Sequence, residues 1–353
     1  MPTHLAAMPH RNPEQACRLI LEHFPEAPGI PRLTKSMRMY LDGIPCLVLD
    51  SEKRRLWFDV SPRREKELIE FYERIEANDL DSFAISRESA PGMYELLEKL
   101  QAKRPPELRL VHIQTPGPVS LGLSVTDDQG IPAFYSETLR DILVKALAMK
   151  AKWQEQKIRK MLPGVQTLVN FGEPSLIVHT SAVGSGSREH IIQAINEVLG
   201  AVEGITCIHC CANIDWTILM DTDTEAINFD AYEYADKIAL YPKELDRFLK
   251  RGGMLAWGIV PTADEKIGQE RVDSLLNRLE RNLTALVDQG LDRQSLLESS
   301  ILTPSCATSM MSLEWAEKAF LFTKEISQRM REKYFKNLSP SPCPPPSIGK
   351  AVP

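Results

Sequence analysis

"MLAWGIV" (254–260), followed by "GQERVDSLLNRLERNLTALVDQG" (268–290), is the stretch that decides the fold class. The first run has seven residues and is almost wholly apolar, which is typical of a strand buried on both faces. In the second run apolar residues recur every three or four positions, the pattern of an amphipathic helix. A buried strand followed by a longer helix is one β-α unit, and such units build parallel sheets.

The same alternation continues along most of the chain. From about residue 105 it predicts six β-α units, whose strands we expect at 108–113, 165–171, 205–209, 225–230, 254–260 and 296–303. Two further units are expected earlier, with strands at 3–8 and 82–86. Eight units predict an α/β fold of the (β/α)8 TIM-barrel type, and a doubly wound open sheet is the alternative.

Two segments fall outside this series. Residues 46–60, "CLVLDSEKRRLWFDV", place two alternating apolar runs around a charged turn, which predicts a β-hairpin inserted after the first β-α unit. Residues 338–353 are rich in proline and serine, so we expect a disordered tail. Residues 1–337, including the inserted hairpin, are expected to form a single catalytic domain.

Composition limits the function. The chain has 353 residues, a net charge of −6 and no long basic run, which argues against nucleic-acid or membrane-surface binding. No apolar run reaches the roughly 18 residues of a membrane span, and the amino-terminal residues do not resemble a secretory signal. We therefore expect a cytoplasmic protein. Its odd count of seven cysteines favours metal binding or catalysis over a disulfide framework.

Three of those cysteines lie in "CIHCCANIDW" (207–216), around one histidine. If the strand at 205–209 continues to Cys211, alternation places Cys207, His209 and Cys211 on one face and Cys210 on the other, toward the helices. His209 and Cys211 then lie where the strand ends. In a barrel that end is the catalytic face.

Other strand ends offer matching side chains. Asp230 ends the strand at 225–230 and Glu233 follows it, while Cys306 follows the last strand. Zinc binds thiolate sulfur, imidazole nitrogen and carboxylate oxygen, so His209, Cys211 and Cys306 with one of the two carboxylates predict a zinc site. A single H-x-C pattern is more often core packing than a ligand pair, and the spacing is not the C-x2-C of a zinc ribbon.

At this point the sequence resembles the carboxyl-terminal catalytic barrel of cobalamin-independent methionine synthase, in the superfamily of uroporphyrinogen decarboxylase. Besides H-x-C and Cys306 in "TPSC", the resemblance rests on "GPVSLG" (117–122) and "GEPSL" (172–176). It implies zinc held by His209, Cys211, Cys306 and a carboxylate. Asp230 aligns with the family's glutamate, and Glu233 is a rival.

The resemblance also implies a substrate site on the same face. Its loops place Ser120 and Glu173 as candidate substrate-binding residues, and Trp257 is a third, either as a stacking platform or as a packed core residue. The sequence departs from the family at Gly172, where an aspartate is usual, and at Ala6 and Ala7, where glycine and serine are usual. No residue is predicted as an acid, base or nucleophile.

These features predict a zinc-dependent methyltransferase that acts on a small-molecule thiol similar to homocysteine. The methyl donor is expected to be a corrinoid protein or a methyl-folate. Three alternatives remain: a corrinoid-dependent methyltransferase acting on another thiol, a metal-free enzyme similar to uroporphyrinogen decarboxylase, and a non-catalytic partner or sensor of a corrinoid protein.

Overall fold

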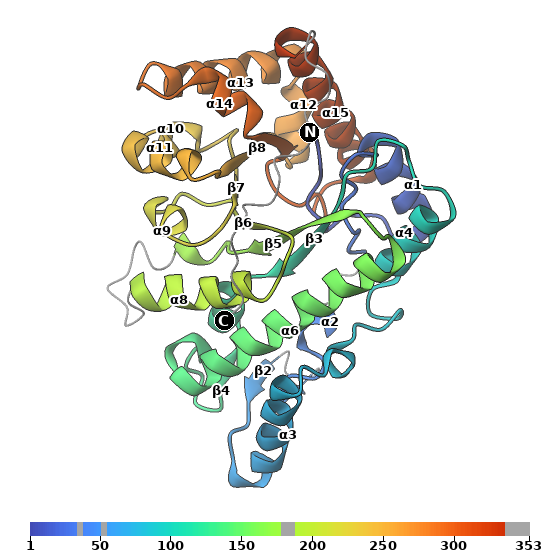
Figure 1. Cartoon of the computed structure of the whole chain (residues 1–353), viewed down its shortest axis with the longest axis vertical. Coiled ribbons are helices and arrows are strands. Elements are labelled where there is room, and N and C mark those ends of the chain that lie inside the picture. Colours follow the sequence, from blue (N-terminus) through green and yellow to red (C-terminus); the bar gives the residue numbers. More distant parts are fainter. Residues whose placement is uncertain (34–37, 51–54, 178–187, 336–353) are drawn as a thin grey trace.

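A computed structural model describes residues 1–33, 38–50, 55–177 and 188–335 of the chain. The predicted tail at 338–353 lies outside these residues. Along the described part strands and helices alternate, and Figure 1 shows a central group of strands with helices α8, α9, α11 and α13 along one side. No helix among the described residues is long and apolar enough to cross a membrane.

The main sheet has six parallel strands in the order β3-β5-β6-β7-β8-β9. Their bounds are Leu110–Pro116, Gln166–Gly172, Ile205–Cys210, Ala226–Phe229, Met254–Val260 and Ser300–Pro304. All six were predicted from apolar runs, although the run at 296–303 begins in a helix, α14 (Arg293–Glu298). The sheet curls as half a barrel, and its ladder is open between β3 and β9.

Two extended amino-terminal segments lie beside the open edges. Pro2 bridges Leu302 of β9, Gly29 bridges His112 of β3, and Ala7 bridges Arg32, which links the two segments. These are isolated bridges rather than ladders. The strand expected at 82–86 is wrong, because a 3-10 helix covers Leu80–Phe83. The segment beside β3 instead contains Pro28 and Pro31, which lack the N–H that a ladder needs.

The helices follow the predicted periodicity closely. Those that follow predicted strands are α1 (Pro13–His23), α4 (Pro91–Ala102), α6 (Glu137–Met161), α8 (Arg188–Gly200), α11 (Pro242–Lys250), α13 (Val272–Val287) and α15 (Leu313–Tyr334). Short helices α2 (Arg38–Leu41), α5 (Pro118–Ser124), α9 (Thr217–Met220), α10 (Ala235–Ile238) and α12 (Asp264–Gln269) lie between them. Proline begins α1, α4 and α11, where its missing N–H has no helical partner to lose.

A second, smaller sheet lies at the opposite end of the molecule from α13, beside helix α3 (Glu65–Glu76) (Figure 1). Strands β1 (Leu47–Asp50) and β2 (Arg55–Phe58) pair antiparallel, as the pattern at 46–60 predicts. The predicted turn between them, 51–54, lies outside the described residues. β2 also pairs in parallel with β4 (Thr126–Asp127), so the sheet has three strands.

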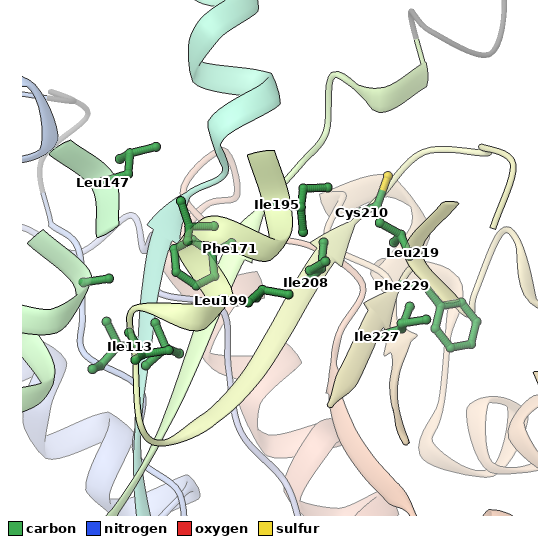
Figure 2. Close-up of a cluster of buried hydrophobic side chains, with 14 of the residues drawn as sticks. Ile113, Leu147, Phe171, Ile195, Leu199, Ile208, Cys210, Leu219, Ile227 and Phe229 are labelled. Carbon is green, nitrogen blue, oxygen red and sulfur yellow. The ribbon is translucent and has the colours of Figure 1, made fainter. Parts of the chain in front are cut away.

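The two faces of the main sheet are packed differently. Outer side chains such as Ile113, Phe171 and Ile227 meet residues of α6, α8 and α9, including Leu147 and Leu199 (Figure 2). The inner face carries a small apolar layer, formed by Ala27, Leu110, Leu168, Ile205, Cys207, Ala226, Met254, Ala256 and Ile301. By alternation along each strand, the inner positions beyond this layer are mostly polar. That polar end contains the candidate site.

Two buried histidines make the fold sensitive to acid. Burial lowers the pKa of His4 to about 4 and that of His112 to about 3, against about 6.5 in an unfolded chain. The unfolded state therefore binds more protons between these values, so stability is fully present above pH 6.5 and is lost as the pH falls toward 4. We expect each histidine to contribute a loss of about 3 kcal/mol over this range.

Urea unfolding at several pH values between 7 and 4 measures this loss. A His4→Gln variant keeps a donor for the Gly29 carbonyl, which lies 3.1 Å from Nε2 of His4, but it has no group that titrates here. Its unfolding free energy should change less steeply with pH than that of the parent protein. Equal slopes for the two proteins would contradict the prediction.

Candidate metal centre

The strand β6 presents its side chains as alternation predicts. Cys207 belongs to the inner apolar layer and His209, on the same face, is only 3% exposed. Cys210 lies in the outer core beside Leu219 and Phe229 (Figure 2). Alternation therefore places the thiol of Cys210 against the helix layer and His209 on the inner face of the curled sheet.

His209, Cys211 and Cys306 come together at the carboxyl-terminal end of the sheet. Their ligand atoms all lie within 4.8 Å of one another, and Sγ of Cys306 is 3.8 Å from Nε2 of His209. A tetrahedral zinc ion with bonds of about 2.0–2.3 Å would separate its ligand atoms by roughly 3.5–3.8 Å. The three side chains therefore fit a zinc ion by donor type and by spacing. Their binding of metal is still a prediction.

Gly258 of β8 allows the end of β9 to approach closely, which brings Cys306 near His209. A Cβ on Gly258 of β8 would lie 2.5 Å from the carbonyl oxygen of Phe229 and 2.7 Å from Cα of Ser305. The register between β8 and β9 also shifts here, between Gly258 and Val260. Close backbone approach at this position therefore requires glycine, and it places the residue before Cys306 against the ends of β7 and β8.

Asn228 of β7 fixes which nitrogen of His209 faces the cysteines. The amide Nδ2 of Asn228 donates to the carbonyl of Ala256 and to Oγ1 of Thr303, both at 2.9 Å. Its Oδ1 consequently faces Nδ1 of His209, 2.6 Å away, and accepts the proton on that nitrogen. Nε2 is left with a lone pair directed at the cysteines, which is the state that binds a metal. The sequence analysis did not predict this role for Asn228.

The two thiols of the cluster do not share one charge state. A hydrogen bond from Cys211 holds the pKa of Cys306 well below that of a free thiol. The same contact with Cys306, together with burial, raises the pKa of Cys211. Of the two thiols, Cys306 is therefore the one that loses its proton more readily. Thiolate is the form of cysteine that binds metal.

The two candidate carboxylates are placed differently. Asp230 follows β7 on the inner face, is 9% exposed and lies close enough to Cys306 for the two charges to interact. Burial raises its pKa to about 6. Glu233 instead pairs with Lys266, with 2.5 Å between Oε1 and Nζ. Within the described chain neither belongs to the 4.8 Å group, so the choice of a fourth ligand stays a prediction.

Glu173 and Ser120 hold two loops together beside the cluster. The carboxylate of Glu173 is fully buried and accepts hydrogen bonds from the backbone N–H groups of Val119 and Ser120, at 2.9 and 2.7 Å. It thereby caps the start of α5, where a Cβ on Gly117 would lie 2.3 Å from the carboxyl carbon. Ser120 Oγ accepts from the N–H of Ser175. Both residues thus position the loops, and substrate contact by either is an untested prediction.

Trp257 lies on the opposite face of β8 from the cluster. It is 1% exposed, its ring packs 5.3 Å from that of Phe229, and its Nε1 donates to Oγ of Ser300. Its neighbour Ala256 belongs to the inner layer, so alternation directs Trp257 toward the helices. The packing interpretation is the one that the structure supports. A substrate-stacking role for Trp257 is incompatible with this position.

Removal of Asn228 should weaken metal binding without removing a ligand. In an Asn228→Leu variant, His209 loses the acceptor that orients its ring and selects its tautomer. Such outer partners typically contribute 10- to 100-fold to metal affinity, so we expect a loss in that range. Competition with a chromogenic chelator measures zinc affinity. Unchanged affinity in a folded variant would contradict the role given to Asn228.

Comparisons with known proteins bear on the fold. No family model and no curated protein matches the sequence. Among solved structures, one from Listeria monocytogenes, provisionally named a vitamin-B12-independent methionine synthase, is similar with a TM-score of 0.54 at 10% identity. The match covers 91% of this chain and 86% of that chain. At this identity the likeness shows the fold alone. It agrees with the fold family that the sequence motifs resemble.

Proposed function

We propose that this protein is a zinc-dependent methyltransferase that transfers a methyl group to a small thiol similar to homocysteine, in the manner of the methionine synthases it resembles. The observation that carries the proposal is the convergence of His209, Cys211 and Cys306 within 4.8 Å at one end of a parallel sheet. Residues 1–337 would form one (β/α)8 catalytic barrel, in which the two extended amino-terminal segments take the first two strand positions.

Each residue of the cluster has a defined task in this proposal. His209, Cys211 and Cys306 would hold the metal, and Asp230 would occupy a fourth position that the acceptor can take. Asn228 keeps the imidazole of His209 in the required tautomer. A bound zinc ion would lower the pKa of an acceptor thiol, which makes it a nucleophile near neutral pH. The chain then has to orient that sulfur and exclude water from it.

The two proposed methyl donors differ in size but present the same reactive group. Either a corrinoid protein or a methyl-folate would present an electrophilic methyl group to the acceptor sulfur at the carboxyl-terminal face. A metal-free reaction similar to that of uroporphyrinogen decarboxylase gives the His209–Cys211–Cys306 cluster no task. A non-catalytic partner of a corrinoid protein would keep the metal and lack turnover.

Zinc analysis and a methyl-transfer assay test the proposal together. We expect about one zinc ion per chain in protein purified without added metal, and thiol-dependent demethylation of methylcobalamin, used here as the donor probe. A Cys211→Ser variant should lose both. Absence of zinc from the parent protein would refute the metal site. Full zinc content without turnover for any thiol would favour the non-catalytic role.

A further inference from the structure

The inner face of the sheet also carries a histidine whose tautomer the structure fixes. Oγ1 of Thr3 donates its single proton to the carbonyl of Ala27 at 2.7 Å. The same oxygen lies 3.1 Å from Nδ1 of His112, so it accepts a proton from that nitrogen. Nε2 of His112 is therefore an unprotonated acceptor. It is buried and has no hydrogen-bond partner among the described residues.

Asn170 stands on the neighbouring strand with its whole amide unpaired. It is 1% exposed, and neither Oδ1 nor Nδ2 has a hydrogen-bond partner in the part of the chain that the structure describes. β3 and β5 run in parallel register, with Gln114 opposite Asn170 and His112 one inner position below Gln114. Leaving buried polar atoms unpaired is costly, so a group of them in one place indicates that something else binds there.

Gly172 leaves room for a methyl group between these residues and the cluster. Gly172 is the next inner position after Asn170 on β5, and it pairs with His209 of β6. A Cβ on Gly172 would come no closer than 3.8 Å to any neighbour, and its second nearest atom is Nε2 of Gln114, at 3.9 Å. The backbone at Gly172 thus leaves room between His209 and the unpaired amide of Asn170.

We propose that this polar pocket, formed by His112, Gln114, Asn170 and the open position at Gly172, binds the uncharged polar end of the acceptor thiol. The proposal rests on the proposed function, because it takes the acceptor sulfur to lie at the His209–Cys211–Cys306 cluster. A hydroxyl group fits the pocket: it donates to Nε2 of His112 or Oδ1 of Asn170 and accepts from Nδ2 of Asn170.

The lining of the pocket is uncharged, which argues against an acceptor thiol with an ionic group at its other end. The inner-face positions of β3, β5 and β6 carry no carboxylate, ammonium or guanidinium group; they are Leu110, His112, Gln114, Pro116, Gln166, Leu168, Asn170, Gly172, Ile205, Cys207 and His209. Burying an unpaired charge against neutral groups is far more costly than burying a hydroxyl. The pocket should therefore prefer a hydroxy-thiol to a zwitterionic amino-acid thiol such as homocysteine.

Direct binding of thiols to cobalt-substituted protein tests this preference without turnover. Sulfur bound to Co²⁺ gives a charge-transfer band in the near ultraviolet, so a dissociation constant can be titrated for each probe. The probes are 2-mercaptoethanol and 3-mercapto-1-propanol, each beside the thiol in which a methyl replaces the hydroxyl, 1-propanethiol and 1-butanethiol, and homocysteine. We expect at least one hydroxy-thiol to bind about tenfold more tightly than its methyl counterpart and more tightly than homocysteine.

An Asn170→Leu variant should abolish that preference and leave thiol binding itself intact. It should fold, because replacing an unpaired buried amide by an apolar group is neutral or stabilising. Asn196→Leu, on α8 outside the barrel, is the matched control and should keep the preference. If no thiol alters the cobalt spectrum, the proposed function fails. If thiols bind but hydroxyl and methyl forms bind equally, or if homocysteine binds best, the pocket assignment alone is overturned.

Discussion

A Cys306→Ser variant is expected to be purified with only a small fraction of one zinc ion per chain and to bind zinc at least about a hundredfold more weakly than the parent protein. Serine keeps the size of the side chain but offers an alcohol with a far higher pKa than a thiol. Cys306 is the thiol of lower pKa in the pair, because it accepts a hydrogen bond from Cys211. The substitution removes one of the three proposed ligand atoms and the negative charge that a thiolate would bring to the ion.

The matched control for this experiment is Cys210→Ala. Cys210 lies one residue before Cys211, but it packs in the outer core beside Leu219 (Figure 2), and its sulfur donates to the carbonyl of Ala212. Any loss of zinc in this variant would come from disturbed packing, not from loss of a ligand. We expect it to retain full zinc content. Atomic emission after dialysis, with chelator competition for affinity, measures both variants. Full zinc in Cys306→Ser, or equal losses in the two variants, would contradict the assignment.

The sequence predicted the six ladder-forming strands because each is an apolar run bounded by a helix. It failed at the second strand position, where it favoured 82–86. Residues 28–32 lie beside β3 instead, but their prolines interrupt both the apolar pattern and the hydrogen-bond ladder. Strand periodicity is visible in sequence only where backbone pairing is regular. An extended segment that is joined to the sheet only by single bridges therefore has no clear strand pattern in its sequence.

The cluster could be predicted from the sequence, whereas the hydrogen bonds that orient its residues could not. Alternation along β6 and the rule that strand ends meet on one face bring His209, Cys211 and Cys306 together. The Asn228 network depends on cross-strand register, as does the contact of Glu173 with α5. The sequence left Trp257 between a stacking and a packing role, although its position next to Ala256 in strict alternation was a usable signal for packing.

Two glycines at the strand ends should respond oppositely to alanine. A Cβ at Gly258 would meet backbone atoms at 2.5 and 2.7 Å, which no side-chain rotation relieves. We expect Gly258→Ala to lower the free energy of unfolding by about 3 kcal/mol or more. At Gly172 the nearest atom lies at 3.8 Å, and the backbone is not in the left-handed region. Gly172→Ala should therefore leave stability unchanged or raise it by up to about 1 kcal/mol, since alanine restricts the unfolded chain.

Zinc affinity should also fall in Gly258→Ala and stay unchanged in Gly172→Ala. Displacement at Gly258 pushes Ser305, and with it Cys306, away from His209, so zinc affinity should fall together with stability. At Gly172 zinc affinity should persist, because the added methyl group makes only ordinary van der Waals contacts and moves no ligand. Urea unfolding and chelator competition on the two variants measure both quantities. If the two variants have equal stability and equal zinc affinity, Cys306 can reach His209 without the close backbone approach at Gly258. The backbone geometry assigned to the site would then be wrong.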